Sequence, residues 1–79
     1  MFHEIESDYC EETFGLEDSD LESLLKLYTN YMKKEGQEPE CENIEEMVQS
    51  VSTFDHVVYH AEIFNEQEVS QILKEAKLS

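Results

Sequence analysis

Arginine is absent from this chain of 79 residues, and its five lysines are outnumbered by twenty acidic side chains. Without guanidinium groups or a basic cluster, the chain cannot clamp phosphate groups, which excludes direct nucleic-acid binding as its main activity. The same shortage disfavours anionic membrane surfaces, which attract polybasic segments. Glycine occurs only twice, and neither a glycine-rich phosphate loop nor a nucleophile elbow is present.

Long hydrophobic runs are also missing, and the sequence shows no secretory signal or lipidation motif. Its two cysteines, Cys10 and Cys41, are too few for the disulfide framework of a small secreted domain. These features predict a cytoplasmic protein with reduced thiols. The length predicts a single small acidic domain over residues 1–79, with a thin hydrophobic core.

Negative charge is what the sequence has in excess. The formal net charge is −15 at pH 7, whereas a magnitude of about 2–8 is typical of a well-behaved small domain. Two long stretches, residues 1–22 and 35–68, contain many acids and no basic residue. Such a field repels itself and lowers stability, so its concentration in continuous stretches suggests that it has a use.

The segment 35–46 concentrates this charge, because half of its residues are glutamates. Pro39 pushes the preceding Glu38 towards an extended conformation. In an extended chain, Glu38, Glu40 and Glu42 share one face at intervals of about 6.6 Å. The amino end repeats this arrangement with Glu4, Glu6 and Asp8. Rows of negative charge at such intervals are what a nucleic-acid backbone presents.

Leucine and tyrosine side chains at helical spacing after position 20 predict a long amphipathic helix. Asp18 or Ser19 is expected as its N-cap, and Gly36 as its left-handed C-cap. Before this helix, the alternation of acidic and mostly apolar positions in residues 1–8 predicts a short edge strand. Gly15 indicates a turn in the irregular stretch between the strand and the helix.

Two N-x-x-E patterns predict the starts of two further amphipathic helices: Asn43 with Glu46, and Asn65 with Glu68. Between these helices, residues 54–64 fit both a helical stripe and the alternation of a strand. Their β-branched and aromatic side chains favour the strand.

Three amphipathic helices with a short strand or a two-stranded antiparallel sheet predict a small α+β domain with two layers. An all-α four-helix arrangement is the alternative. A strand at 56–64 would pair with residues 2–6 and join the acidic amino end to the middle of the chain. An unpaired edge of that sheet would also suit pairing with a second copy in a homodimer.

Candidate zinc ligands are Cys10, Cys41, His56 and His60, because the two histidines have a spacing found in zinc sites. On a strand, however, these histidines would lie about 13 Å apart and could not hold one ion together. The cysteines do not form a C-x2-C pair and are distant from the histidines in sequence. Ordinary thiols and surface histidines are therefore expected, without a metal site.

Asp18, Asp20 and Glu22 resemble the start of an EF-hand loop, but the glycine and the final glutamate of that loop are missing. Carboxylates that catalyse acid–base chemistry need opposed environments, one buried and one solvated. The acids here are numerous and solvated, and a domain this small has little room for a pocket. We expect a protein that is not an enzyme and that needs no cofactor.

In length, charge and carboxylate rows, the chain resembles the small acidic DNA mimics that are encoded largely by bacteriophages. These proteins inhibit restriction enzymes, CRISPR effectors, uracil-DNA glycosylase or the histone-like nucleoid protein HU, and they share no common fold or alignable motif. The resemblance implies an inhibitor that occupies the basic DNA-binding surface of another protein. If the chain is encoded by a phage, it would act in the cytoplasm of the host cell.

The expected partner-binding residues are acids of the amino segment, the 35–46 segment and the second helix: Glu4, Glu6, Asp8, Glu11, Glu12, Glu35, Glu38, Glu40, Glu42, Glu45 and Glu46. Tyr9, Phe14 and Tyr59 would add desolvated anchors, with core packing as the alternative for most of them. The alternative function is an acidic interaction module or regulatory subunit whose partner does not bind DNA. Such a module would use an apolar helix face or a strand edge, and its charge would serve only solubility.

Overall fold

A β-hairpin at the amino end leads into five helices in the computed structural model, which describes residues 1–78. The strands are β1 (Phe2–Ser7) and β2 (Glu12–Glu17). The helices are α1 (Asp18–Lys34), α2 (Ile44–Gln49), α3 (Val51–Tyr59), α4 (Ala61–Phe64) and α5 (Glu66–Ala76). The protein is therefore the predicted α+β domain with a two-stranded antiparallel sheet. None of these helices, within the described residues, is both long and apolar enough to cross a membrane.

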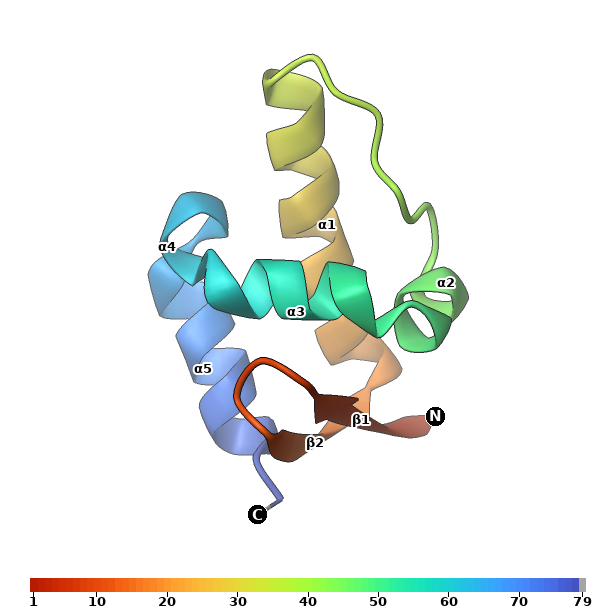
Figure 1. Ribbon diagram of the computed structural model, residues 1–79, viewed down its shortest axis with the longest axis vertical. Helices are drawn as coiled ribbons and strands as arrows, with labels where there is room; N and C mark the ends of the chain where they lie inside the picture. The colour runs from red at the N-terminus through yellow and green to blue at the C-terminus, as the bar shows by residue number, and fades with distance from the viewer. Residues whose placement is uncertain (79) are drawn as a thin grey trace.

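The long helix α1 stands along the longest axis of the molecule, and α3 crosses in front of it (Figure 1). The hairpin lies at one end of this axis with α5 beside it, and the segment between α1 and α2 runs down one side. One core joins these elements through completely buried side chains: Leu16 of β2, Leu24 of α1, Met47 of α2, Phe54 of α3 and Val69 of α5.

The hairpin shows the alternation that the sequence predicted for its first strand. Ile5 and Ser7 of β1 are buried, while Glu4 and Glu6 are exposed. Because side chains of a strand alternate between its two faces, this burial directs the acidic positions towards solvent. The edge strand predicted in residues 1–8 is confirmed, and it pairs along its length with β2.

Gly15 is not the turn residue that the sequence indicated. It lies within β2, opposite Glu4, and the chain reverses over residues 8–11, where Glu11 has a positive φ of 54°. A Cβ atom at Gly15 would lie 2.3 Å from Cζ of Phe2, so the aromatic ring needs the space that glycine leaves. A glycine inside a strand typically marks such a close approach.

The long helix α1 begins at Asp18, and its N-cap is Glu17, which corrects the prediction of Asp18 or Ser19. The backbone amide of Glu17 donates a hydrogen bond of 3.2 Å to the carboxylate of Asp20, which is one half of a capping box. At the other end Gly36 takes a φ of 70°. This left-handed residue ends the helix as predicted.

The asparagine caps of α2 and α5 are confirmed. The side-chain oxygen of Asn43 accepts a hydrogen bond of 2.9 Å from the amide of Glu46, and that of Asn65 accepts one of 3.1 Å from the amide of Glu68. These bonds satisfy amides that have no partner within the helix. The second helix is shorter than its apolar pattern suggested, because the chain bends at Ser50 before it continues as α3.

Residues 51–59 are helical, so the strand predicted at 54–64 is wrong. Phe54 and Val57 of α3 are completely buried, and the burial of this helical stripe outweighs the strand preference of the β-branched residues. β1 pairs with β2 instead. The expected pairing of residues 56–64 with residues 2–6 is therefore also wrong, while the homodimer stays a prediction.

Candidate functional site

Two groups of carboxylates form most of the predicted partner-binding surface. The hairpin acids are Glu4, Glu6, Asp8, Glu11 and Glu12. The acidic segment is residues 35–46, which includes the first turn of α2. All of these acids are exposed except the half-buried Glu12. The structure places the two groups in different regions: the hairpin at one end of the long axis, and the segment along one side from the other end of α1 (Figure 1).

The acidic segment has the alternation on which its predicted row of charges depends. Glu38, Glu40 and Glu42 are exposed, and Pro39 between them is half-buried. Cys41 is almost completely buried, with 2% of its surface accessible. The intervening residues thus hold the segment to the protein, and the three glutamates remain on its outer side.

Hydrogen bonds fix this segment to the helices beneath it. The backbone amide of Glu40 donates to Oη of Tyr28 on α1 at 2.8 Å. The Cys41 thiol donates to Oγ1 of Thr53 on α3 at 3.3 Å. Near α2, the amide of Glu42 donates a bond of 3.3 Å to the side chain of Glu46. Two of these bonds are to neutral groups and the third is to a carboxylate of the segment itself, so none of them reduces the negative charge of the row.

Very few positive groups compensate this surface. In the described part of the chain, the one lysine that pairs with a carboxylate is Lys77, whose Nζ lies 2.8 Å from Oε1 of Glu12. The hydrogen bond and the charge of Glu12 raise the pKa of Lys77 above its ordinary value. Among the predicted partner-binding acids, the other carboxylates form no ion pair with any described residue.

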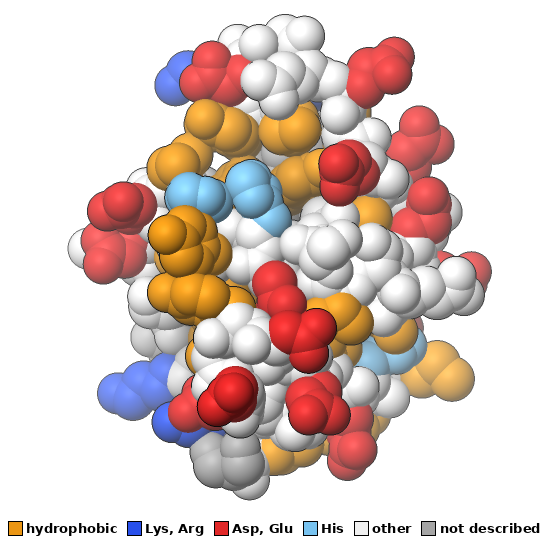
Figure 2. Space-filling view, viewed as in Figure 1, with side chains coloured by type: hydrophobic (Ala, Val, Ile, Leu, Met, Phe, Trp, Pro, Cys, Tyr) orange, Lys and Arg blue, Asp and Glu red, His pale blue; other side chains and the backbone are white. Residues whose placement is uncertain are grey.

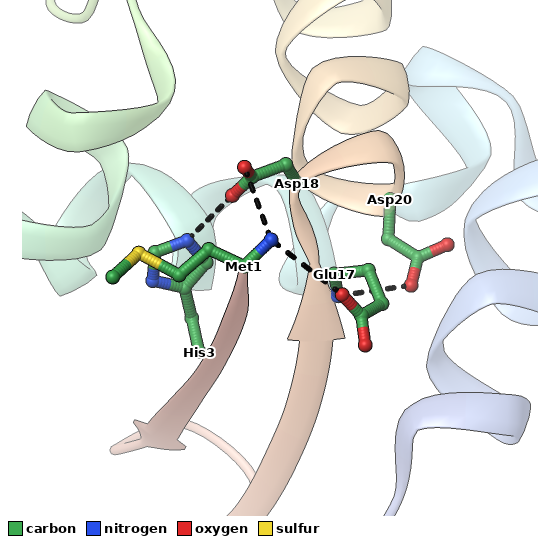
Figure 3. A network of polar contacts seen from close by, with 5 residues as sticks. All are labelled: Met1, His3, Glu17, Asp18 and Asp20. Atoms are coloured by element: carbon green, nitrogen blue, oxygen red, sulfur yellow. Dashed lines mark hydrogen bonds and ion pairs between the residues drawn. The ribbon is translucent and has the colours of Figure 1, made fainter.

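The acids at the start of α1 hold the hairpin and the helix together (Figure 3). Oδ1 of Asp18 lies 2.7 Å from Nε2 of His3, and its Oδ2 lies 3.3 Å from the terminal ammonium group of Met1. The hydrogen bond with His3, helped by this ammonium group, lowers the pKa of Asp18. Asp20 bonds the amide of Glu17. Two of the three acids that resemble an EF-hand start, Asp18 and Asp20, therefore serve the structure of this corner.

The histidines considered as zinc ligands lie close together, contrary to the separation expected on a strand. The ring centroids of His56 and His60 are 4.9 Å apart at the end of α3. Cys10 and Cys41 are free thiols, and Cys41 is engaged with Thr53. Within residues 1–78, no group of three or more His, Cys, Asp or Glu side chains is placed to hold a metal ion.

Carboxylates lie on both sides of the face shown in Figure 2, whereas lysines appear only on its left side. Red carboxylates follow the right side, where the acidic segment runs in Figure 1, and continue over the lower part of the face. Blue lysines appear only on the left. A band of hydrophobic and histidine side chains separates the two sides. The right side of this face therefore shows carboxylates with no lysine among them.

Tyrosine, histidine and phenylalanine rings form a continuous strip of ring contacts that the sequence did not predict. The aromatic strip comprises, in order of contact, Tyr9, Tyr59, His60, His56, Phe64 and Tyr31. Successive ring centroids lie between 4.5 and 5.7 Å apart. Tyr9 and Tyr59 are 55% and 58% exposed, whereas Phe14, the third expected anchor, is only 3% exposed and belongs to the core.

A hollow of about 430 Å³ opens beside the part of the strip that runs from His60 to Tyr31. It lies between α1, the acidic segment, α3 and α4. The side chains that line it are Tyr28, Tyr31, Met32, Gln37, Glu40, Ser52, Thr53, His56, His60, Ile63 and Phe64. One glutamate of the predicted row, Glu40, is therefore also part of this hollow.

The spacing of His56, His60 and Phe64 is the sequence signal that points to the strip. Each lies four positions after the one before it, so a helical conformation places them on one face. The strand reading of this stretch concealed that relation. The hollow has no comparable local signal, because its walls come from four elements.

The site is thus a surface of carboxylates, most of them without an ion pair to any described residue, beside an aromatic strip. Charge on one side and large aromatic contacts on the other are features typical of protein-binding surfaces. Comparison with protein-family models, with curated proteins and with solved structures finds no match to this chain, so its function is inferred from this surface.

Proposed function

We propose that this protein is a DNA mimic that binds the basic DNA-binding surface of a host protein. A nucleoid protein of the HU type or a restriction, CRISPR or repair nuclease would provide such a surface. The observation that carries the proposal is the acidic segment. Its glutamates alternate with the anchored residues Pro39 and Cys41, and none of them forms an ion pair with a described residue. A row held in this way presents charge to a cationic groove as phosphates do.

Charge and apolar contact would contribute different parts of the binding. Long-range attraction between the acids and a basic groove accelerates association and makes it sensitive to salt. Affinity depends more on desolvated anchors, in which tyrosine is enriched. The exposed pair Tyr9 and Tyr59, whose centroids are 4.8 Å apart, lies where the aromatic strip meets the hairpin acids. It is suited to that role.

Competition with DNA is the direct test. The immobilised protein is used to capture partners from a bacterial lysate, and a captured basic protein is then titrated against fluorescent duplex DNA. We expect this chain to displace the DNA, and its affinity for the partner to fall steeply as salt is raised. A partner that binds the chain and the DNA together, without interference, would contradict the proposal.

Two variants with the same change in net charge locate the surface. The first replaces acids of the segment that do not line the hollow: Glu38→Gln, Glu42→Gln and Glu45→Gln. The matched control replaces acids of α5: Glu66→Gln, Glu68→Gln and Glu75→Gln. We expect the first to weaken partner binding about tenfold or more at low salt, from about 0.5–1 kcal/mol for each lost interaction. The control should change it far less.

The aromatic strip favours one other function, an interaction module whose partner does not bind DNA. Tyr59 is 58% exposed although it is large and apolar, which is typical of a protein-binding surface. In that case Tyr59→Ala would abolish binding, while the variant of Glu38, Glu42 and Glu45 would bind normally. The reverse ranking of the two variants supports DNA mimicry.

A further inference from the structure

The hollow beside α3 is lined by rings in several orientations. Phe64 lies at the centre of this group, with ring centroids 5.1 Å from Tyr31, 5.7 Å from His56 and 6.0 Å from Tyr28. Its plane meets those of Tyr31 and His56 at 68° and 75°. The rings therefore form walls of different orientation and not a flat stack. The volume of about 430 Å³ lies within the range of about 300–1,000 Å³ typical of ligand sites.

The electrostatic character of this hollow favours a cation. The face of an aromatic ring attracts positive charge within about 6 Å of its centroid. With histidines neutral, Glu40 carries the one formal charge among the lining residues. The backbone of Glu40 is held at the hollow by the hydrogen bond of 2.8 Å from its amide to Oη of Tyr28. The smaller hollow that adjoins this one, of about 270 Å³, includes Lys34 and is unsuited to a cation.

We infer that this hollow binds an arginine side chain of the partner, with the guanidinium group against the rings and its charge beside Glu40. Arginine suits the site better than lysine, because a guanidinium group is planar, stacks on aromatic rings and is weakly hydrated. The inference rests on the proposed function, since a DNA-binding surface is the source of the arginine. One seated arginine would fix the register of a complex that charge alone would leave loose.

The test uses small probes, so that it does not depend on finding the partner. N-acetyl-arginine amide is titrated into the labelled protein at pH 7.5 and followed by NMR. N-acetyl-citrulline amide, which has nearly the same shape without the charge, is the control probe. We expect saturable shifts at Tyr31, His56, His60 and Phe64 with arginine, and binding at least about threefold weaker with citrulline. N-acetyl-lysine amide should also bind more weakly than arginine.

Three results would overturn the inference. Equal affinity for arginine and citrulline would mean that the hollow accepts any group of this shape. Shifts spread along the acidic segment, with none in the hollow, would mean that arginine only condenses on the negative surface. Lysine binding as tightly as arginine would remove the assignment to a guanidinium group.

Variants of neighbouring glutamates make the test specific. Glu40→Gln removes the charge at the hollow, and Glu42→Gln removes an equal charge two residues away on the same segment. The first should weaken arginine binding about threefold or more, and the second should leave it nearly unchanged. Phe64→Leu, which keeps an apolar side chain without a ring, should weaken it at least as much. If Phe64→Leu fails to fold, the comparison of Glu40→Gln with Glu42→Gln, both at exposed positions, still decides the result.

Failure of this inference can be told apart from failure of DNA mimicry. If arginine binds in the hollow but DNA does not compete for the partner, the arginine site stands and DNA mimicry falls. If DNA competes and arginine gives no shifts in the hollow, the arginine site is overturned and the mimicry rests on the carboxylates alone.

Discussion

Ser7, at the end of β1, is completely buried although it carries a hydroxyl group. Its Oγ donates a hydrogen bond of 2.6 Å to Oδ1 of Asp55 on α3 and accepts one of 3.4 Å from the amide of Cys10. The amide of Asp8 donates to the other carboxylate oxygen of Asp55. One buried hydroxyl group and one carboxylate therefore join the hairpin to a helix 48 residues away in sequence.

Ser7→Ala should lower the free energy of unfolding by about 1.5–3 kcal/mol, the usual worth of a hydrogen bond to a charged group. Urea unfolding followed by circular dichroism measures this change. Ser70→Ala, at an exposed position of α5, is the matched control and should stay within about 0.5 kcal/mol of the wild type. A Ser7 variant as stable as this control would show that the bond to Asp55 contributes nothing.

Asp18 gives a prediction for the dependence of stability on pH. Its pKa is lowered in the folded protein, chiefly by the hydrogen bond with His3. A carboxyl group with a lowered pKa stabilises the folded state above its ordinary pKa, and this contribution is lost as pH falls through the lowered value. Asp18→Asn should therefore be less stable than the wild type near pH 7, and the difference should shrink as pH falls below the ordinary pKa of aspartate and disappear below the lowered one.

Urea midpoints of both proteins between pH 7 and about pH 2.5 provide the measurement. Glu22→Gln, a change of equal charge at an exposed position of the same helix, serves as control and should show no comparable trend. If the difference at Asp18 persisted at low pH, its contribution would come from the shape of the side chain and not from its charge.

At the scale of elements, the sequence predicted what local chemistry determines. The caps at Asn43 and Asn65 and the left-handed Gly36 mark helix ends through bonds to near neighbours. The stretch 54–64 was different, because its apolar residues fit both the period of a helix and the alternation of a strand. The choice between them depended on which face the rest of the chain could bury. In the structure β1 pairs with β2, so residues 54–64 are not needed as its partner. The sequence of 54–64 alone does not contain that information.

The candidate site likewise has features that local sequence predicted and features that depend on how distant segments meet. The alternation of exposed glutamates with Pro39 and Cys41 follows from a local conformational preference, and it is present in the structure. The aromatic strip required the correct helical reading of α3, so the sequence interpretation missed it. The hollow requires four elements to meet. No pattern within one segment predicts such a meeting, and nothing local indicated that Glu40 would border it.

Tyr28→Phe tests how the acidic segment is held. Tyr28 is 2% exposed, and its hydroxyl oxygen accepts the hydrogen bond of the Glu40 amide. Removing that oxygen leaves the amide without its acceptor. We expect a loss of about 0.5–1.5 kcal/mol in the free energy of unfolding, and faster hydrogen exchange at the Glu40 amide, measured by NMR.

Tyr31→Phe is the matched control for this change, because Tyr31 lies on the same helix and lines the same hollow. It should leave exchange at Glu40 unaltered. Equal protection of the Glu40 amide in both variants would show that Tyr28 does not anchor the segment, and the row of glutamates would then need another support.

At low salt, the electrostatic repulsion between carboxylates reaches about as far as the dimensions of the whole molecule. Its principal extents are 36, 23 and 21 Å, and none of the acidic side chains in residues 1–78 is buried. At 0.01 M salt the Debye length is about 30 Å, so carboxylates repel one another across most of the molecule. At 0.1 M it is about 10 Å, and only near neighbours still interact.

The melting temperature should therefore rise between about 0.01 and 0.1 M sodium chloride. Each kcal/mol of relieved repulsion raises it by about 4–8 °C in a domain of this size, so thermal circular dichroism should detect the shift. The variant Glu38→Gln, Glu42→Gln and Glu45→Gln should melt higher at low salt and gain less from added salt. A flat profile in the wild type would mean that the carboxylates are too dispersed to repel. Charges that do not sense one another would not act together on a cationic groove, and DNA mimicry would lose its physical basis.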